Sequence, residues 1–189
     1  MNVSACLVTR GDVDMTEILA SIEAAGITDV CIWNNSLEID LAVFGRYAVM
    51  DQAVNDIIYV QDDDCVVNIP RLLGMAKLWP LNQKIVANMP ESRWPDYPDS
   101  CLVGWGAIFH RDLVYDAWRR FTAYRAIGRD AAAFNRECDA VFTTLTPHVK
   151  IDVGFSHLPW AEDPGRAMYL SPRPDRETMY ALAREARDA

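Results

Sequence analysis

The sequence predicts an α/β fold in which helices flank a mostly parallel, mixed central sheet, in a single Rossmann-like domain. Short continuous apolar runs are typical of strands that are buried on both faces, as in parallel sheets. In the first third of the chain these runs alternate with segments of helical periodicity, which is the pattern of a parallel sheet with right-handed crossovers. The length of 189 residues suits one well-buried domain and hardly two.

The N-terminal third has the clearest alternation of elements. The apolar and helical patterns predict strands over residues 3–9, 29–34 and 57–60, with helices over 15–25 and 45–54 between them. Asp14 and Glu17 have the spacing of a capping box, and Gly26 is placed to end the first helix. Because the carboxyl ends of parallel strands open onto the ligand crevice of such a sheet, we expect functional residues after these strands.

The remaining two thirds of the chain hold shorter elements. The pattern predicts strands over 83–88, 107–109 and 148–153, and helices over 70–78, 113–124, 135–145 and 176–187. Segment 89–100 holds three prolines together with Trp94 and Tyr97, so we expect no regular structure there. This segment is either a binding loop or a surface loop whose rings cover the core.

Composition and charge narrow the class of protein. An apolar fraction of 51% and a charged fraction of 24% are those of a soluble globular protein, and the net charge of −9 disfavours binding to nucleic-acid phosphates. The five cysteines are scattered, and Cys6 and Cys31 fall inside predicted strands as small buried residues instead of forming a disulfide framework. Without a leader-like N-terminus or an apolar run that could span a bilayer, we expect a reducing, cytoplasmic location.

Three consecutive carboxylates, Asp62, Asp63 and Asp64, follow the third predicted strand. Crowding three like charges is unfavourable unless something positive lies among them, and the neighbouring sequence supplies no Lys or Arg. A hard divalent cation, shared with a phosphate-bearing ligand in the crevice, would meet this need. The alternative is a solvated acidic turn after a strand.

The motifs, taken in order, resemble those of the GT-A class of nucleotide-sugar glycosyltransferases. The matching stretches are 8–10 (Val-Thr-Arg), 34–36 (Asn-Asn-Ser), 59–64 (Tyr-Val-Gln-Asp-Asp-Asp), 104–106 (Gly-Trp-Gly) with Phe109, 137–139 (Glu-Cys-Asp) and His157. They cover nearly the whole chain, the aspartate motif is the sharpest, and the chain is similar to a small exostosin-like or family-2-like member. The resemblance implies one glycosyltransferase domain over 1–189, with a nucleotide-sugar-binding half (1–66), an acceptor half (67–158) and a C-terminal loop and helix (159–189).

The resemblance also implies a metal-dependent transfer of a sugar from a UDP- or GDP-sugar to an acceptor hydroxyl. Asp64 would ligate Mn²⁺ or Mg²⁺, Asp62 would lie toward the ribose or a metal-bound water, and Asp63 would contact the donor sugar. His157 matches the position of a third metal ligand, although a lone His is more often a structural residue. The metal would stabilise the negative charge that builds on the leaving diphosphate.

Further candidates for binding the nucleotide sugar come from other loops. By resemblance, Thr9 and Arg10 would contact the nucleotide, and Asn34 or Asn35 would bind the base edge through its amide. Many family members have an acidic residue at this asparagine pair, so the choice between UDP and GDP stays open. The remaining candidates are Arg46 toward the diphosphate, Trp105 and Gly106 at a sugar face, and Arg166 with Tyr169 in a lid over the diphosphate. For each of them the alternative is ordinary loop or core chemistry.

An inverting transfer needs a carboxylate that removes the proton of the acceptor hydroxyl. The resemblance assigns this role to Asp139, with Glu137 as the alternative. Two other functions stay open: a haloacid-dehalogenase-like phosphohydrolase with Asp62 as nucleophile, and a non-catalytic sugar-nucleotide-binding protein. The phosphohydrolase motif normally opens its domain, whereas two predicted strands precede it here, and no later Gly-Asp-x-x-x-Asp segment completes such a site.

Overall fold

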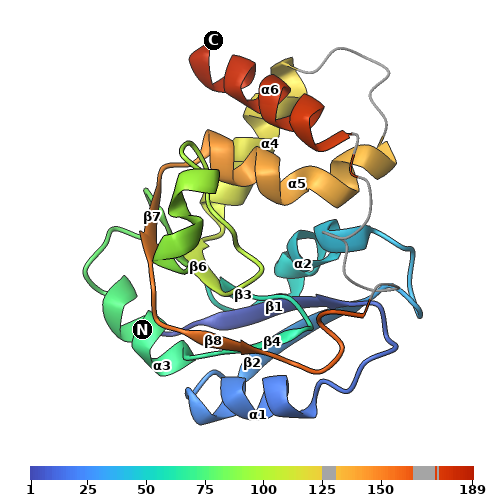
Figure 1. The fold of residues 1–189 in the computed structure, drawn as a ribbon, viewed down its shortest axis with the longest axis vertical. Coiled ribbons are helices and arrows are strands. Elements are labelled where there is room, and N and C mark those ends of the chain that lie inside the picture. The colour runs from blue at the N-terminus through green and yellow to red at the C-terminus, as the bar shows by residue number, and fades with distance from the viewer. Residues whose placement is uncertain (125–130, 164–172, 174) are drawn as a thin grey trace.

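A six-stranded sheet forms the centre of the computed structural model, which describes residues 1–124, 131–163, 173 and 175–189. The strand order is β2-β1-β3-β6-β5-β7 (Figure 1). The strands are β1 (Ser4–Thr9), β2 (Asp29–Asn34), β3 (Ile57–Val60), β5 (Ile85–Asn88), β6 (Ala107–His110) and β7 (His148–Ile151). β6 pairs antiparallel with β3 and with β5, and the other pairings are parallel. The predicted mostly parallel, mixed sheet is therefore confirmed.

Helices cover both faces of this sheet (Figure 1). One face packs against α1 (Thr16–Ala24) and α3 (Ile69–Ala76), and the other against α2 (Gly45–Ala48), α4 (Asp112–Tyr124), α5 (Ala131–Leu145) and α6 (Asp175–Asp188). Short 3₁₀ segments flank α2, namely η1 (Ala42–Phe44) and η2 (Val49–Gln52). None of the helices within the described ranges is long and apolar enough to cross a membrane.

Alternate residues of each strand supply two hydrophobic cores, one on each face of the sheet. In β3, Ile58 and Val60 belong to the core beneath α2, α4, α5 and α6, whereas Tyr59 belongs to the core beneath α1 and α3. This is the two-residue period of a strand. Because both faces are covered, both sets of residues are apolar, which explains the continuous apolar runs in the sequence. Cys6 and Cys31 are buried and free in neighbouring strands, as predicted.

Some local predictions were wrong. The helix predicted over 45–54 is shorter and mixed: α2 ends at Ala48, the 3₁₀ segment η2 follows directly and ends at Gln52, and Ala53 is already extended. Segment 89–100 contains a 3₁₀ segment, η3 (Glu91–Asp96), whose Pro95 has a φ that suits such a turn. The capping box of the first helix does not form, since Asp14 accepts from Thr16 and the cap position is Met15.

The sequence pattern also missed a small second sheet beside the first. β4 (Cys65–Val67) pairs antiparallel with β8 (Phe155–His157), and each strand has only three residues, which is too short for a periodic pattern. This pairing brings the chain that follows the aspartates next to the chain that follows β7. Residues 158–161, which follow β8, are thereby held close to the aspartate motif: Leu158 donates its N–H to the Asp64 carbonyl oxygen at 2.8 Å.

Candidate functional site

The aspartate motif lies at the carboxyl end of β3, beside the carboxyl ends of β1 and β2. The antiparallel strand β6 adds its own amino-terminal end to this edge, because Val60 pairs with Ala107. Asp62 donates its backbone N–H to the carbonyl oxygen of Gly104 at 2.7 Å. The structure thus brings the Gly-Trp-Gly segment against the first aspartate, although the two are some forty residues apart in the sequence.

Gly104 leaves room for the Asp62 carboxylate. A Cβ at this position would lie 2.0 Å from Oδ2 of Asp62, closer than any real contact, so a side chain here would displace the aspartate. Gly106 has a different role. It adopts φ +97°, which favours glycine, and a Cβ there would press on Val67 of β4 at 2.9 Å.

Gln61 fixes the shape of the turn that carries the three carboxylates. Its side chain is fully buried; its Nε2 donates to the carbonyl oxygen of Cys65 at 2.7 Å, and its Oε1 accepts from the Tyr59 hydroxyl at 2.6 Å. A buried amide with both ends bonded holds its neighbours in one arrangement. The two hydrogen bonds of the buried Gln61 side chain therefore fix the backbone on either side of residues 62–64.

Asp64 has the strongest signature of a missing positive partner. Its Oδ1 is buried and has no hydrogen-bond partner among the described residues. Burial, and after it the charges of Asp62 and Asp63, raise the pKa of this carboxyl to about 7, against the opposing charge of Arg46. A buried carboxylate oxygen without a partner costs free energy, and a cation would remove that cost.

A divalent cation fits these residues. No group of three or more His, Cys, Asp or Glu side chains converges within the described ranges, so the protein itself would offer one or two carboxylates. Mg²⁺ sites that serve phosphate ligands usually have this form, because phosphate and water oxygens complete the coordination. The unpartnered oxygen of Asp64 is the ligand that such a cation would use first.

Asp63 faces the loop after β1. The Thr9 hydroxyl and the Arg10 backbone N–H, the latter at 3.4 Å, hydrogen-bond to its carboxylate, and burial raises its pKa while these bonds oppose the rise. On the other side, Trp160 donates its indole N–H to the Asp63 carbonyl oxygen at 2.9 Å. Arg10, Asp63, Asp64 and Trp160 line a small cavity of about 40 Å³, which has room for a cation or a water molecule.

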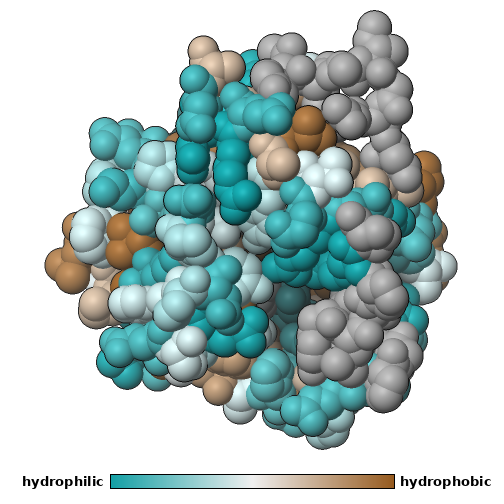
Figure 2. Space-filling view, turned by 45° about the horizontal axis from the view of Figure 1, so that its top comes forward, coloured by the Kyte–Doolittle hydropathy of each residue, from teal (hydrophilic) through white to brown (hydrophobic). Residues whose placement is uncertain are grey.

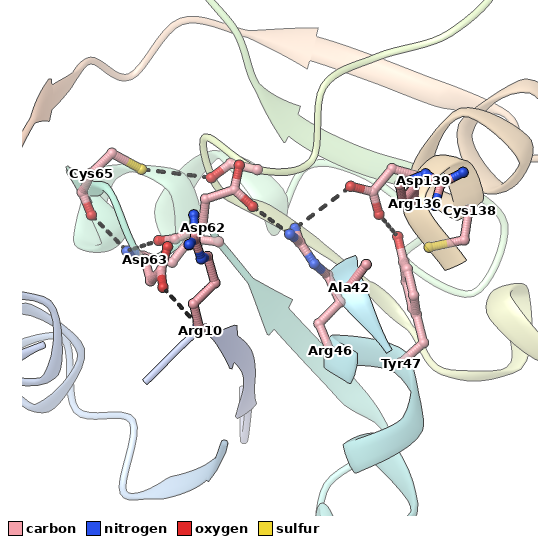
Figure 3. A network of polar contacts seen from close by, with 12 residues as sticks. Arg10, Ala42, Arg46, Tyr47, Asp62, Asp63, Cys65, Arg136, Cys138 and Asp139 are labelled. Carbon is pink, nitrogen blue, oxygen red and sulfur yellow. Dashed lines mark hydrogen bonds and ion pairs between the residues drawn. The ribbon is translucent and has the colours of Figure 1, made fainter. Parts of the chain in front are cut away.

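Arg46 lies between two carboxylates that come from opposite sides of the site (Figure 3). Its side chain is only 1% exposed; Nη2 donates to Oδ1 of Asp62, and Nη1 lies 3.8 Å from Oδ2 of Asp139. Burial alone would lower the pKa of the guanidinium, but Asp139 and Asp62 hold it above its ordinary value. Arg46 therefore carries a permanent buried charge that joins the aspartate motif to α5.

Asp139 is oriented by a second partner. The Tyr47 hydroxyl donates to Oδ1 of Asp139 at 2.6 Å, while Oδ2 faces Arg46 (Figure 3). Burial raises the pKa of Asp139, and the Arg46 charge and the Tyr47 hydrogen bond oppose that rise. A carboxylate with a raised pKa that remains 28% exposed has the chemistry of a proton acceptor.

Glu137 is in a different situation from Asp139. It is 2% exposed, and its two oxygens accept from Nε and Nη2 of Arg173, each at 2.7 Å. This bidentate pair occupies both oxygens of the carboxylate and ties the segment before α6 to α5. Glu137 is thus committed to an internal ion pair, which leaves Asp139 as the more available of the two candidate bases.

The asparagine pair after β2 is engaged within its own loop. Oδ1 of Asn34 accepts from the backbone N–H and the hydroxyl of Ser36, at 2.9 and 2.7 Å. Asn35 donates to the carbonyl oxygen of Ala42 at 3.1 Å and accepts from the Leu41 N–H at 2.9 Å. Asparagine side chains commonly form such hydrogen bonds to the backbone of turns.

Trp105 and His157 belong to one aromatic cluster. Trp105 stacks on Phe155 with ring centroids 4.7 Å apart, and the exposed ring of His157 lies edge-on to both, 6.1 Å from Trp105 and 5.0 Å from Phe155. The His157 backbone pairs with Cys65, next to Asp64, while its side chain packs against rings. Arg166 and Tyr169, the predicted lid residues, lie outside the described residues.

Sequence reasoning missed four residues that shape the site: Tyr47, Gln61, Trp160 and Arg173. Gln61 left a signal, since it is a lone amide in an otherwise apolar strand and must find partners when buried. The other three reach the site only through tertiary contacts between residues far apart in the sequence.

Comparisons with known proteins agree with this fold. No family model and no curated protein matches the sequence. Among solved structures, the chain is similar to glucosyl-3-phosphoglycerate synthase from Mycobacterium tuberculosis in complex with Mg²⁺ and UDP, at a TM-score of 0.60 and 10% identity, covering 97% of this chain and 79% of that one.

Two proteins from Thermus thermophilus match less well. A hypothetical transferase has a TM-score of 0.42 and 15% identity, covering 86% of this chain and 99% of its own. A 2-C-methyl-D-erythritol 4-phosphate cytidylyltransferase has a TM-score of 0.43 and 14% identity, covering 97% of this chain and 100% of its own. With TM-scores below 0.5, these two matches carry no argument. The similarity to the synthase, at 10% identity, shows the fold alone, and that fold is GT-A-like.

Proposed function

We propose that this chain is a metal-dependent glycosyltransferase that moves a sugar from a UDP- or GDP-sugar to an acceptor hydroxyl. The observation that carries the proposal is the unpartnered, buried carboxylate oxygen of Asp64 at the carboxyl end of β3, the edge where open α/β sheets bind ligands. The GT-A-like fold supports it, as does the similarity to a synthase whose structure holds Mg²⁺ and UDP. The division into a nucleotide-sugar-binding half (1–66), an acceptor half (67–158) and a C-terminal segment (159–189) is part of the same proposal.

In this proposal Asp64 and Asp62 hold Mn²⁺ or Mg²⁺, which would neutralise the charge on the leaving diphosphate when bound. Thr9 and Arg10 contact the nucleotide on the β1 side. His157 is kept as a further candidate ligand because its backbone pairs beside Asp64. Trp105 is the candidate surface for a sugar ring, since aromatic faces suit the apolar face of a sugar.

The acceptor side of the reaction rests on Asp139. As the acceptor oxygen forms a bond to the anomeric carbon and the bond from that carbon to the diphosphate breaks, the acceptor proton must leave. In an inverting transfer Asp139 takes this proton. Tyr47 fixes the orientation of its carboxylate, and Arg46 stabilises its charged form before the transfer.

The two alternatives predict different behaviour at the same residues. A phosphohydrolase would need Asp62 as an open nucleophile, whereas Asp62 is ion-paired with the buried Arg46 and pressed against Gly104. A non-catalytic binding protein would have no use for an oriented carboxylate with a raised pKa opposite the aspartates, which Asp139 supplies.

Calorimetry with UDP- and GDP-sugars, with and without Mn²⁺, tests the proposal. We expect one nucleotide to bind in the presence of metal and the Asp64→Ala variant to lose that dependence. If no nucleotide binds, or if binding ignores both the metal and the substitution, the proposal fails. Hydrolysis of a generic phosphate ester that is lost in Asp62→Asn would point to the phosphohydrolase instead.

A further inference from the structure

A second cavity lies between α6 and the segment that contains η3. We call it the arginine–tyrosine cavity; its volume is about 340 Å³. Arg93 and Tyr97 supply one wall, and Arg176, Tyr180 and Arg184 supply the other. The three α6 residues are spaced four apart and therefore lie on one face of that helix. A volume of this size accommodates a small organic molecule.

The walls of this cavity are polar and carry charges of both signs. Three guanidinium groups line it together with two carboxylates, Asp96 and Glu177, in a protein whose net charge is −9. Arg93 pairs with Asp96 at 3.1 Å, and Arg184 pairs with Asp99 at 3.7 Å. These pairs are largely exposed and weak, so the two arginines retain donors for a ligand.

Arg176 lies between two tyrosine rings. Its guanidinium carbon is 5.8 Å from the centroid of Tyr97 and 5.7 Å from that of Tyr180, and it donates to the Tyr97 hydroxyl at 3.0 Å. None of the described carboxylates forms an ion pair with it. It also occupies the first turn of α6, where the helix dipole disfavours a positive side chain. Its contacts with the two rings and the Tyr97 hydroxyl hold the guanidinium at the cavity wall, and an anion in the cavity would supply the counter-charge that no described carboxylate gives it.

The cavity is separate from the aspartate motif but connected to α5. None of its lining residues belongs to the site around Asp62 and Asp64. Arg173, just before α6, holds Glu137 in the bidentate pair, and Arg136 pairs with Asp175 at 2.9 Å.

In Figure 2, where the end of the molecule that carries α6 comes forward, hydrophilic residues prevail over the visible face. This surface therefore suits a polar ligand better than an apolar partner.

We propose that the arginine–tyrosine cavity binds a small phosphate monoester of a polyol. The guanidinium of Arg176, aided by Arg93 and Arg184, bonds the phosphate, since a planar fork of donors suits its oxygens. Ser100 and the carboxylates of Asp96 and Glu177, which also line the cavity, accept hydrogen bonds from the hydroxyl groups of the polyol. This site is additional to the nucleotide-sugar site and does not depend on a metal ion.

Titration of the full-length chain with glycerol 3-phosphate, in EDTA and at low ionic strength, tests this assignment by calorimetry. We expect saturable binding that weakens as salt is added, and no binding of glycerol itself. Arg176→Gln should bind at least about tenfold more weakly, which is the usual effect of losing a charged hydrogen-bond donor. Asp64→Asn should bind like the wild type, so a failure of the glycosyltransferase proposal would leave this result intact.

Arg119→Gln is the matched control, because Arg119 is an exposed helical arginine that pairs with Asp116, and neither residue lines the cavity. Arg93→Gln provides a second cavity variant whose loss removes only an exposed ion pair, in case Arg176→Gln does not fold, and it should weaken binding at least about threefold. Absence of saturable binding by the wild type, or equal weakening by the cavity and control variants, would overturn the proposal.

Discussion

Replacing Arg46 by alanine removes a buried charge that joins the two sides of the candidate site. Arg46 is 1% exposed and contacts Asp62 and Asp139, which are 38% and 28% exposed. Removing one partner of a buried ion pair costs about 3–5 kcal/mol, because the other charge stays buried alone. Since both carboxylates keep some contact with water, we expect the low end, about 3 kcal/mol.

The loss should depend on pH. Burial already raises the pKa of Asp139, and Arg46 opposes that rise, so the pKa rises further without Arg46. A carboxyl whose pKa is higher in the folded state than in the unfolded state contributes stability at low pH and loses it as the pH rises through the folded-state value. The deficit of Arg46→Ala relative to the wild type should therefore be larger at pH 8 than at pH 5.

Urea denaturation at both pH values measures this difference directly. Arg119→Ala is the control, because its exposed pair with Asp116 should change the free energy of unfolding by less than about 1 kcal/mol at either pH. Arg46→Lys keeps the positive charge but loses the planar guanidinium with its several donors, so its loss of unfolding free energy should lie between those of Arg46→Ala and Arg119→Ala. A deficit for Arg46→Ala that is below about 1 kcal/mol, or equal at pH 5 and pH 8, would refute the reasoning.

Three further predictions concern individual residues. In EDTA, the wild type should lose stability relative to Asp64→Asn as the pH rises from 6 to 8, because the pKa of Asp64 is raised to about 7 in the folded state; parallel urea curves across that range would contradict it. Gly104→Ala should cost about 1–3 kcal/mol, since its Cβ would overlap the Asp62 carboxylate, whereas Gly74→Ala in α3, where no atom lies within 4 Å, should be neutral or stabilise by up to about 1 kcal/mol; equal denaturation midpoints for the two variants would rule out the steric argument. Asp139→Asn should keep the calorimetric affinity for the nucleotide sugar and lose transfer, and undiminished turnover would eliminate Asp139 as the base.

The sequence predicted the sheet well because its strands are covered on both sides. β2 (Asp29–Asn34) was predicted with its observed bounds, and the aspartate motif was placed at the correct edge of the sheet. These features are local: an apolar run identifies the strand, and the residues after it are carried to the crevice by the parallel topology. The antiparallel β4–β8 pair gave no such signal, because three residues cannot display a period.

The partners of the site residues were harder to foresee. That Arg46 faces the diphosphate stays a prediction. Its described partners Asp62 and Asp139 were not foreseen, and neither was Tyr47, which reaches Asp139 from the adjoining position. These contacts join residues 16 and 92 positions apart in the sequence, and a sequence pattern records no such distances. Glu137 was likewise an open candidate until its pairing with Arg173 could be seen.

The antiparallel direction of β6 has a consequence for how the protein tolerates insertions. The register that pairs Val60 with Ala107 leaves two residues, Trp105 and Gly106, between the β6 strand and Gly104, whose carbonyl oxygen accepts from the Asp62 N–H. An added residue between Gly104 and Ala107 would move that carbonyl off the aspartate, or shift β6 by one and turn its core side chains to the wrong face. A residue added between η3 and Val103 lies outside this register and leaves the spacing from Gly104 to Ala107 unchanged. We therefore expect insertions to be tolerated better in the loop after η3 than between Gly104 and Ala107, because the aspartates then keep their positions.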